Sequence, residues 1–150
     1  MTSGQFFQKY LKDNKIKEED IVYSGEMCFE SSGVTGIEQC ELVKTGKKTC
    51  CFTAFESFDI NLEPLPVVGE IYVVENTEEK PFCIIELDDV KVLPFNEVSW
   101  EMARQEGEDQ SLEEWRDKQR EYMEEEAALC GFDFTDESLV VFEHFHVIYK

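Results

Sequence analysis

Positive charge is scarce in this chain of 150 residues. Lysine and arginine number 14 against 34 aspartates and glutamates, a formal net charge of −20 at pH 7. Such a field repels polyanions, so nucleic-acid binding would need a local basic patch. The candidates for that patch are Lys44, Lys47 and Lys48. The acidic excess otherwise has an ordinary explanation as solvated surface.

Other absences exclude several classes of protein. No apolar run approaches the length of a membrane span, and no basic stretch followed by an apolar one marks a secretory signal at the start. The six cysteines form no Cys-x-x-Cys pair, and the only histidines are His144 and His146. We therefore expect reduced thiols, no metal or other cofactor, no contact with a membrane and a cytoplasmic location.

The apolar spacing predicts both helices and strands within one domain, residues 1–150, that begins with a helical extension over about 1–20. Helices are predicted over 3–12, 36–45, 95–106 and 112–130, and strands over 49–55, 67–75, 82–93 and 139–149. Capping-box patterns start two helices, at Thr35-Gly36-Ile37-Glu38 and Ser111-Leu112-Glu113-Glu114. Because strands and helices do not alternate regularly, we expect an α+β fold with a small, mostly antiparallel sheet or barrel.

Two adjacent thiols follow a basic turn. Cys50 and Cys51 point to opposite faces of the predicted strand, so one belongs to the core and the other can face a cavity. A thiol beside Lys47 or Lys48 would have a lowered pKa and act as a nucleophile. Lys48 and Cys51 converge only if the chain turns at about Lys48-Thr49. The structural alternative is a pair of small apolar residues in a buried strand.

Carboxylates crowd the end of the predicted 95–106 helix. Glu106, Glu108 and Asp109 lie close in sequence, and like charges held together raise one carboxyl pKa, which suits a general acid. The alternative is a solvated acidic loop before a helix N-terminus. Two further polar residues interrupt apolar patterns. Gln119 is either a satisfied core amide or part of a pocket, and Glu143 either faces solvent at an edge or binds a buried lysine.

Taken together, these motifs resemble the ASCH domain family, in its longer bacterial subgroup, from about residue 20 to the end of the chain. The matching segments are Gly46-Lys47-Lys48-Thr49, Val68-Gly69-Glu70-Ile71, Phe95-Asn96-Glu97-Val98, Ala103-Arg104-Gln105-Glu106-Gly107-Glu108, Ser111-Leu112-Glu113-Glu114-Trp115-Arg116 and Val141-Phe142-Glu143-His144-Phe145. The resemblance implies a PUA-like β-barrel of about five or six strands, with helices around a cleft.

The resemblance also implies roles for particular residues. Family members have been thought to bind RNA, and one small bacterial member looks like an amidohydrolase acting on acetylcytidine. Its lysine corresponds to Lys48 and its proton-handling glutamate to Glu106, whereas its threonine nucleophile corresponds to Cys51. Two other positions depart from the family pattern: Gln119, often a histidine in this subgroup, and Thr53, an arginine in shorter members.

We therefore predict a cleft that binds a nucleoside or a small amide, with Lys48 as base or activator, Cys51 as nucleophile and Glu106 as proton donor. Ligand contacts are predicted for Lys47, Thr49, Glu108, Trp115 and Gln119. The alternative is a non-catalytic RNA-binding module that uses the turn over 44–48, although the net charge disfavours RNA. A third hypothesis is a small-ligand binder or interaction protein in which Cys51 has ordinary thiol reactivity.

Overall fold

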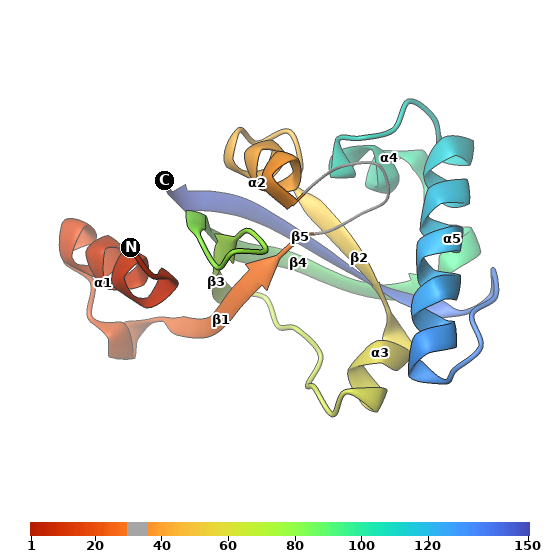
Figure 1. Cartoon of the computed structure of the whole chain (residues 1–150), viewed down its shortest axis with the longest axis horizontal. Coiled ribbons are helices and arrows are strands. Elements are labelled where there is room, and N and C mark those ends of the chain that lie inside the picture. Colours follow the sequence, from red (N-terminus) through yellow and green to blue (C-terminus); the bar gives the residue numbers. More distant parts are fainter. Residues whose placement is uncertain (30–35) are drawn as a thin grey trace.

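A five-stranded open sheet organises the chain, with strand order β1-β3-β4-β5-β2 (Figure 1). The computed structural model describes residues 1–29 and 36–150. The strands are β1 (Val22–Cys28), β2 (Cys50–Ala54), β3 (Glu70–Glu75), β4 (Pro81–Pro94) and β5 (Leu139–Tyr149). β1 runs parallel to β3, and the other three pairings are antiparallel.

Helices flank the sheet. They are α1 (Ser3–Asn14), α2 (Gly36–Lys44), α3 (Phe55–Ile60), α4 (Trp100–Ala103) and α5 (Leu112–Cys130), with 3₁₀ turns at Glu18–Asp20, Phe95–Glu97 and Arg104–Glu106. In Figure 1, α1 lies at the end of the sheet that holds β1 and β3, and α5 stands at the opposite end. In the described part of the chain, no helix is long and apolar enough to cross a membrane.

The expected α+β class is confirmed, but the expected barrel is not closed. Closure would require the two outer strands to pair, and in the described residues β1 pairs only with β3 and β2 only with β5. Side chains of both outer strands instead border a cavity, described below. The sheet therefore remains open where the cavity lies.

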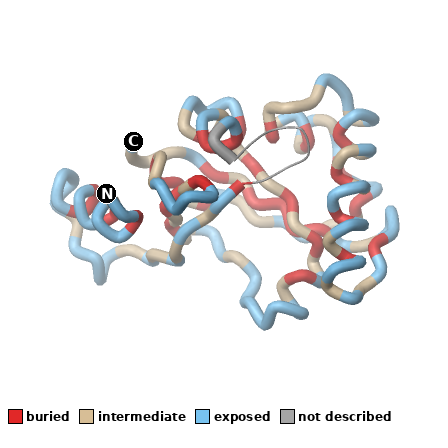
Figure 2. Tube along the Cα trace, viewed as in Figure 1, coloured by how far each residue is buried: buried red, intermediate tan, exposed pale blue. Residues whose placement is uncertain are grey.

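Three apolar clusters form the core, and Figure 2 shows where the buried residues lie along the chain. The largest packs α4 and α5 against β2 and β5 and includes Phe52, Phe95, Trp115, Met123 and Phe142. The second joins α2 to β3, β4 and β5, and the third packs Phe7, Tyr10 and Leu11 of α1 on β3 and β4. Burial of these side chains is the main favourable term in folding.

Helix ends follow from local sequence. The Ser111 hydroxyl accepts from the Glu114 N–H, but the Glu114 carboxylate accepts from the Gln110 N–H, so only half of the predicted capping box forms. α5 ends at Cys130, as predicted, and Gly131 follows in the left-handed region. The other predicted box begins at Thr35, which lies outside the described residues.

Two elements were not predicted, and one predicted helix is broken. β1 contains Ser24 and Glu26, and its register slips at Gly25, whose φ is +114°, so its apolar signal is weak. α3 is only six residues long. The helix predicted over 95–106 is instead α4 between two 3₁₀ turns, because Ser99 caps a new start.

Gly107 brings two segments into close contact. Its φ is +79°, and a Cβ added there would lie 2.6 Å from the Lys47 carbonyl oxygen. Gly131 also has a positive φ, +85°, but nothing lies within 4 Å of its added Cβ. Both glycines therefore adopt a positive φ, which disfavours other residues, but only Gly107 also lacks room for a side chain.

We predict that Gly107→Ala lowers the free energy of unfolding by about 1–3 kcal/mol more than Gly131→Ala does, because overpacking adds to the left-handed strain. Urea unfolding of the two variants measures the difference. Equal losses would show that the Lys47 contact costs nothing.

Candidate functional site

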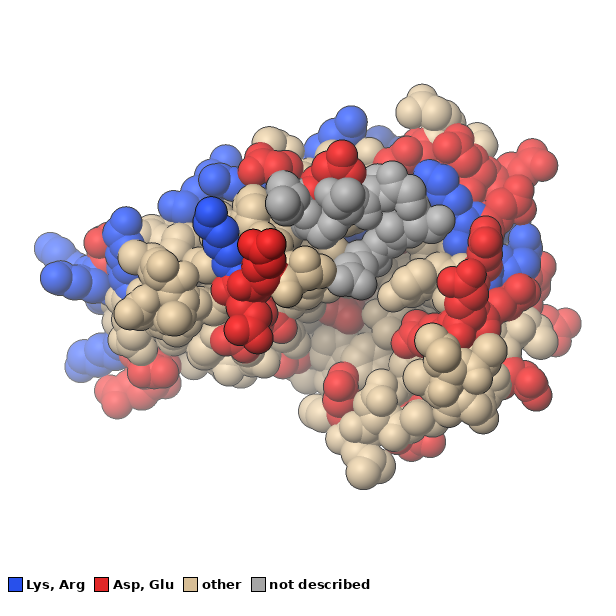
Figure 3. Space-filling view, in the orientation of Figure 1, with Lys and Arg blue, Asp and Glu red and all other residues tan. Residues whose placement is uncertain are grey.

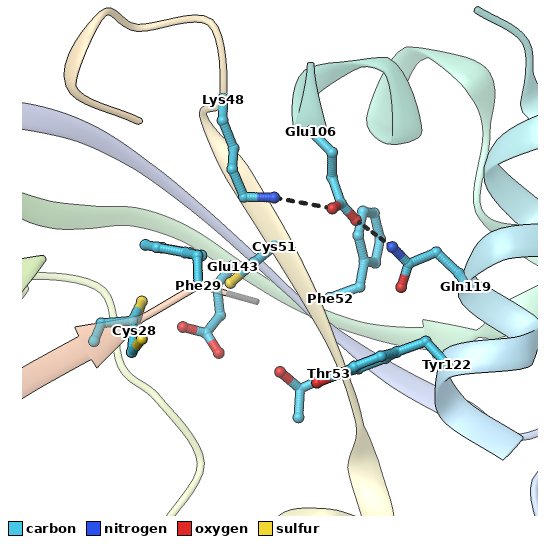
Figure 4. Close-up of a pocket in the computed structure, with 11 residues that line it drawn as sticks. Cys28, Phe29, Lys48, Cys51, Phe52, Thr53, Glu106, Gln119, Tyr122 and Glu143 are labelled. Atoms are coloured by element: carbon cyan, nitrogen blue, oxygen red, sulfur yellow. Dashed lines mark hydrogen bonds and ion pairs between the residues drawn. The ribbon is translucent and has the colours of Figure 1, made fainter. Parts of the chain in front are cut away.

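A cavity of about 270 Å³ lies beside the open edge of β2 (Figure 4). Side chains from the two outer strands and the residues next to them, from β5, from the turn after α4 and from α5 line it. They are Met27, Cys28, Phe29, Lys48, Cys51, Phe52, Thr53, Glu106, Gln119, Tyr122 and Glu143. Because β2 is an outer strand, residues from both of its faces reach this space.

A buried ion pair forms one wall. Lys48 Nζ donates to Glu106 Oε2 at 3.0 Å, and each side chain is about 3–4% exposed. Glu106 Oε1 accepts from Trp115 Nε1 at 3.1 Å and from Gln119 Nε2 at 3.3 Å. Three donors from two elements thus hold one carboxylate, which offsets much of the cost of burying its charge.

Backbone hydrogen bonds place Lys48 at the cavity. The N–H groups of Lys47 and Lys48 both donate to the carbonyl of Leu42, near the end of α2. The Thr49 N–H then donates to the Gln105 carbonyl at 2.8 Å, which ties the start of β2 to the turn that carries Glu106. The turn needed for Lys48 and Cys51 to reach one cavity is therefore present.

Lys48 stays a cation. Burial lowers its pKa, but the charges of Glu106 and Glu108 and the hydrogen bond that Lys48 donates to Glu106 outweigh burial, and the net pKa is raised. Such a lysine suits polarising a carbonyl group rather than removing a proton. Its ammonium nitrogen also lies over the ring of Phe29, with Nζ 5.5 Å from the ring centroid.

The two thiols diverge as predicted. Cys50 is fully buried in the core, whereas Cys51 is half-buried and lines the cavity. The predicted lowering of the thiol pKa is wrong. Burial raises the pKa of Cys51, the Glu143 charge raises it further, and Lys48 only partly opposes them. Lys48 is engaged by Glu106, so Cys51 rests as a thiol and needs a base to react.

Glu143 lies directly across from Cys51 in the β2–β5 register. It is 5% exposed, and neither a hydrogen bond nor an ion pair reaches its carboxylate from the described residues. Burial is the larger cause, and the charge of Glu70 the smaller one, of a rise in its pKa to about 7. The sequence alternatives for this residue were an exposed edge or a bound lysine, and its position matches neither.

The predicted site residues divide into two groups. Lys48, Cys51, Glu106 and Gln119 come together at the cavity. The other four lie outside the set of described residues that line it: Lys47 is exposed, Thr49 joins β2 to its neighbours, Glu108 accepts from Gln39, and Trp115 is buried. Trp115 instead holds Glu106 in place.

The three carboxylates that the sequence places at this turn lie beside three different partners. Glu106 turns to Lys48, Glu108 to Gln39, and Asp109 to Lys118, whose Nζ lies 2.8 Å from Oδ1. Each of the three carboxylates therefore has a polar partner of its own.

Three lining residues that matter to the site were not predicted as site residues. Phe29 and Tyr122 carry no sequence signal that separates them from core or surface aromatics. Glu143 had a signal, because a carboxylate in the middle of an apolar strand is rarely buried without a role. In the described residues, no group of three or more His, Cys, Asp or Glu side chains is arranged to hold a metal ion.

The first prediction from this site concerns the ion pair. Glu106→Gln leaves the Lys48 cation buried without a carboxylate and should cost about 3–5 kcal/mol of unfolding free energy. The double variant Lys48→Met, Glu106→Gln should lose less than the sum of the single losses. A double-mutant cycle by urea unfolding measures this coupling, and strict additivity would contradict it.

The raised pKa of Glu143 should make the stability of the protein depend on pH. Its folded pKa of about 7 exceeds the ordinary 4.5, so its contribution to stability is complete below pH 4.5 and is lost as the pH rises through 7. The titratable groups that share its cavities are Cys51, Lys48, Glu106, Glu26, Glu63, Glu70, Tyr72, Tyr122, Cys28 and Glu126.

The Gln side chain of Glu143→Gln stays neutral at every pH. As the pH rises from 4.5 to above 7, the free energy of unfolding of this variant should therefore increase relative to that of the wild type, by up to roughly 3 kcal/mol. Unfolding across pH tests this, with Glu137→Gln, at an exposed position, as a charge-matched control. A difference that does not vary with pH would refute the assignment.

Comparison with known proteins gives the same family as the sequence motifs. The family model for the ASCH domain matches residues 25–149. The ASCH domain of Lactobacillus crispatus JV V101 is 29% identical, with a TM-score of 0.85 over 99% of this chain and 94% of that one. A protein from Enterococcus faecalis V583 is 25% identical, with a TM-score of 0.83 over 99% and 93%. No curated protein matches. From the extent of the family match, the chain belongs to the ASCH domain family.

Proposed function

We propose that this protein binds a nucleoside or a similarly small amide in the cavity beside β2 and hydrolyses its amide bond through Cys51. The observation that carries the proposal is the placement of the Cys51 thiol and a buried Lys48–Glu106 ion pair at the same cavity. A volume of about 270 Å³ is at the low end for small-molecule pockets, which favours a single small ligand.

Each group has a role in the proposed reaction. The Cys51 thiol gives its proton to Glu106 as sulfur bonds to the amide carbonyl carbon, and the Lys48 ammonium stabilises the oxygen that becomes negative. The carbon–nitrogen bond then breaks, and Glu106 passes the proton to the leaving nitrogen. This leaves an acyl group on Cys51 and a free amine.

Water completes the cycle. Its oxygen bonds to the acyl carbon while Glu106 takes one of its protons, the carbon–sulfur bond breaks, and the proton returns to sulfur. The net change is one amide and one water converted to an acid and an amine. Gln119, which donates to Glu106, would keep the carboxylate oriented throughout.

Binding of RNA finds less support. Two carboxylates, Glu106 and Glu143, lie in the cavity wall, and the net charge of −20 repels phosphates. Lys47 is exposed beside the cavity but does not line it among the described residues. We therefore give the small-ligand hypothesis precedence.

We predict that the protein releases free amine from acetylcytidine or from other members of a panel of acylated nucleosides and small acylated amines. Cys51→Ala should lower the rate by roughly a thousandfold or more, because it removes the proposed nucleophile. Chromatography follows deacylation, and mass spectrometry of quenched reactions should find the acyl group on the peptide that contains Cys51.

Cys130→Ala is the matched control, since this thiol lies at the end of α5, outside the described cavity lining. It should react at the wild-type rate. Full activity in Cys51→Ala would remove the thiol from the mechanism. If no member of the panel turns over, the hydrolase hypothesis fails, and measured binding of RNA or of intact ligands decides between the other two.

A further inference from the structure

A second cavity continues from the first. It measures about 560 Å³ and shares Met27, Thr53 and Glu143 with the cavity of Figure 4. We call it the acidic trench, because five carboxylates line it: Glu26, Glu63, Glu70, Glu126 and Glu143. In Figure 3 the surface is hollowed below the centre of the view, and Asp and Glu atoms appear around the hollow.

The trench carboxylates are not balanced by protein cations. None of the described residues that line it is a lysine or arginine, and none of the five joins an ion pair in the described part of the chain. Their hydrogen-bond donors are neutral. Tyr23 donates to Glu26, Ser24 and Tyr72 donate to Glu70, and Ser57 donates to Glu126 at 2.9 Å.

Glu143 makes the trench more than a cluster of surface charges. It is 95% buried, since its exposed fraction is 5%, and it receives neither a hydrogen bond nor an ion pair from the described residues. Figure 4 shows its carboxylate extending into the cavity on the side away from Lys48. A buried carboxylate without a partner is costly, and a cation brought by a ligand would remove that cost.

The shape of the trench favours an organic cation over a metal ion. The carboxylates are spread along the walls, and in the described residues no three of them are arranged to hold a metal. Between them lie the apolar or aromatic side chains of Met27, Phe58, Pro64, Pro66 and Tyr72. An alkyl chain packs against such groups, and an ammonium group is attracted to aromatic faces.

We propose that the acidic trench binds a flexible organic amine that carries two or more protonated nitrogens along an alkyl chain, with one ammonium group held by Glu143. Charges spaced along an apolar chain match carboxylates spaced along an apolar wall. The inference does not require Cys51 to be catalytic. If Cys51 does cleave amides, an amine site in the trench specifies the substrate class: an acylated amine with a second, free ammonium group.

The test is calorimetric titration of the full-length protein with spermidine at pH 8 and constant ionic strength, a pH at which Glu143 is mostly charged. We expect saturable binding at one site. Glu143→Gln and Glu70→Gln should each weaken it by about tenfold or more, since each removes a charge-assisted contact. Butylamine, with a single nitrogen, should bind more weakly than spermidine.

Glu137→Gln controls for net charge, because this exposed residue lies outside the described trench lining. It should bind spermidine as the wild type does. The proposal is overturned if spermidine gives no saturable binding, if Glu137→Gln loses as much affinity as Glu143→Gln, or if Mg²⁺ at equal ionic strength displaces spermidine. Glu70→Gln keeps the test valid should Glu143→Gln alter the fold.

Failure of this inference is distinguishable from failure of the proposed function. Turnover of neutral acylated nucleosides without spermidine binding would leave the hydrolase hypothesis standing and remove the amine site. Saturable, Glu143-dependent spermidine binding without turnover of any acylated compound would do the reverse.

Discussion

The buried contact between Lys48 and Glu106 joins two segments that lie 58 residues apart in the sequence. It connects the start of β2 with the turn after α4, and α5 supports it through Trp115 and Gln119. Two isolated charges could not remain at this depth, because each would pay a large desolvation cost. Their pairing lets a cation and a carboxylate stand at a cavity wall while the surrounding core stays apolar.

The open edge of the sheet also serves the cavity. A closed barrel satisfies every strand edge, yet here β1 and β2 leave their outer edges unpaired in the described chain. Side chains from both strands turn toward the space between them, where the cavity lies. Polar groups from α5 and from the turn after α4 then complete its walls. The fold therefore forgoes one strand pairing and gains a site open to a ligand.

Much of this arrangement could be predicted from sequence, for reasons that particular residues make clear. Four strands and the long α5 carry strong periodicity, and the divergence of Cys50 and Cys51 follows from strand geometry alone. β1 was missed because its polar residues dilute that periodicity. The pairing of Glu106 with Lys48 and of Glu108 with Gln39 depends on contacts between distant segments, which local spacing does not encode.

The role of Glu143 was harder still to predict, because it depends on the burial of its carboxylate without a hydrogen bond or an ion pair from the described residues. When ionised, it raises the pKa of the Cys51 thiol across the strand pair, which favours the unreactive thiol form. A ligand ammonium beside Glu143 would cancel that effect and favour the thiolate. Amine binding in the trench and nucleophilic attack at Cys51 would then be coupled through one carboxylate. If Cys51 does cleave amides, an acylated amine with a free ammonium group would favour the thiolate that attacks it, and a neutral amide such as acetylcytidine would react without that assistance.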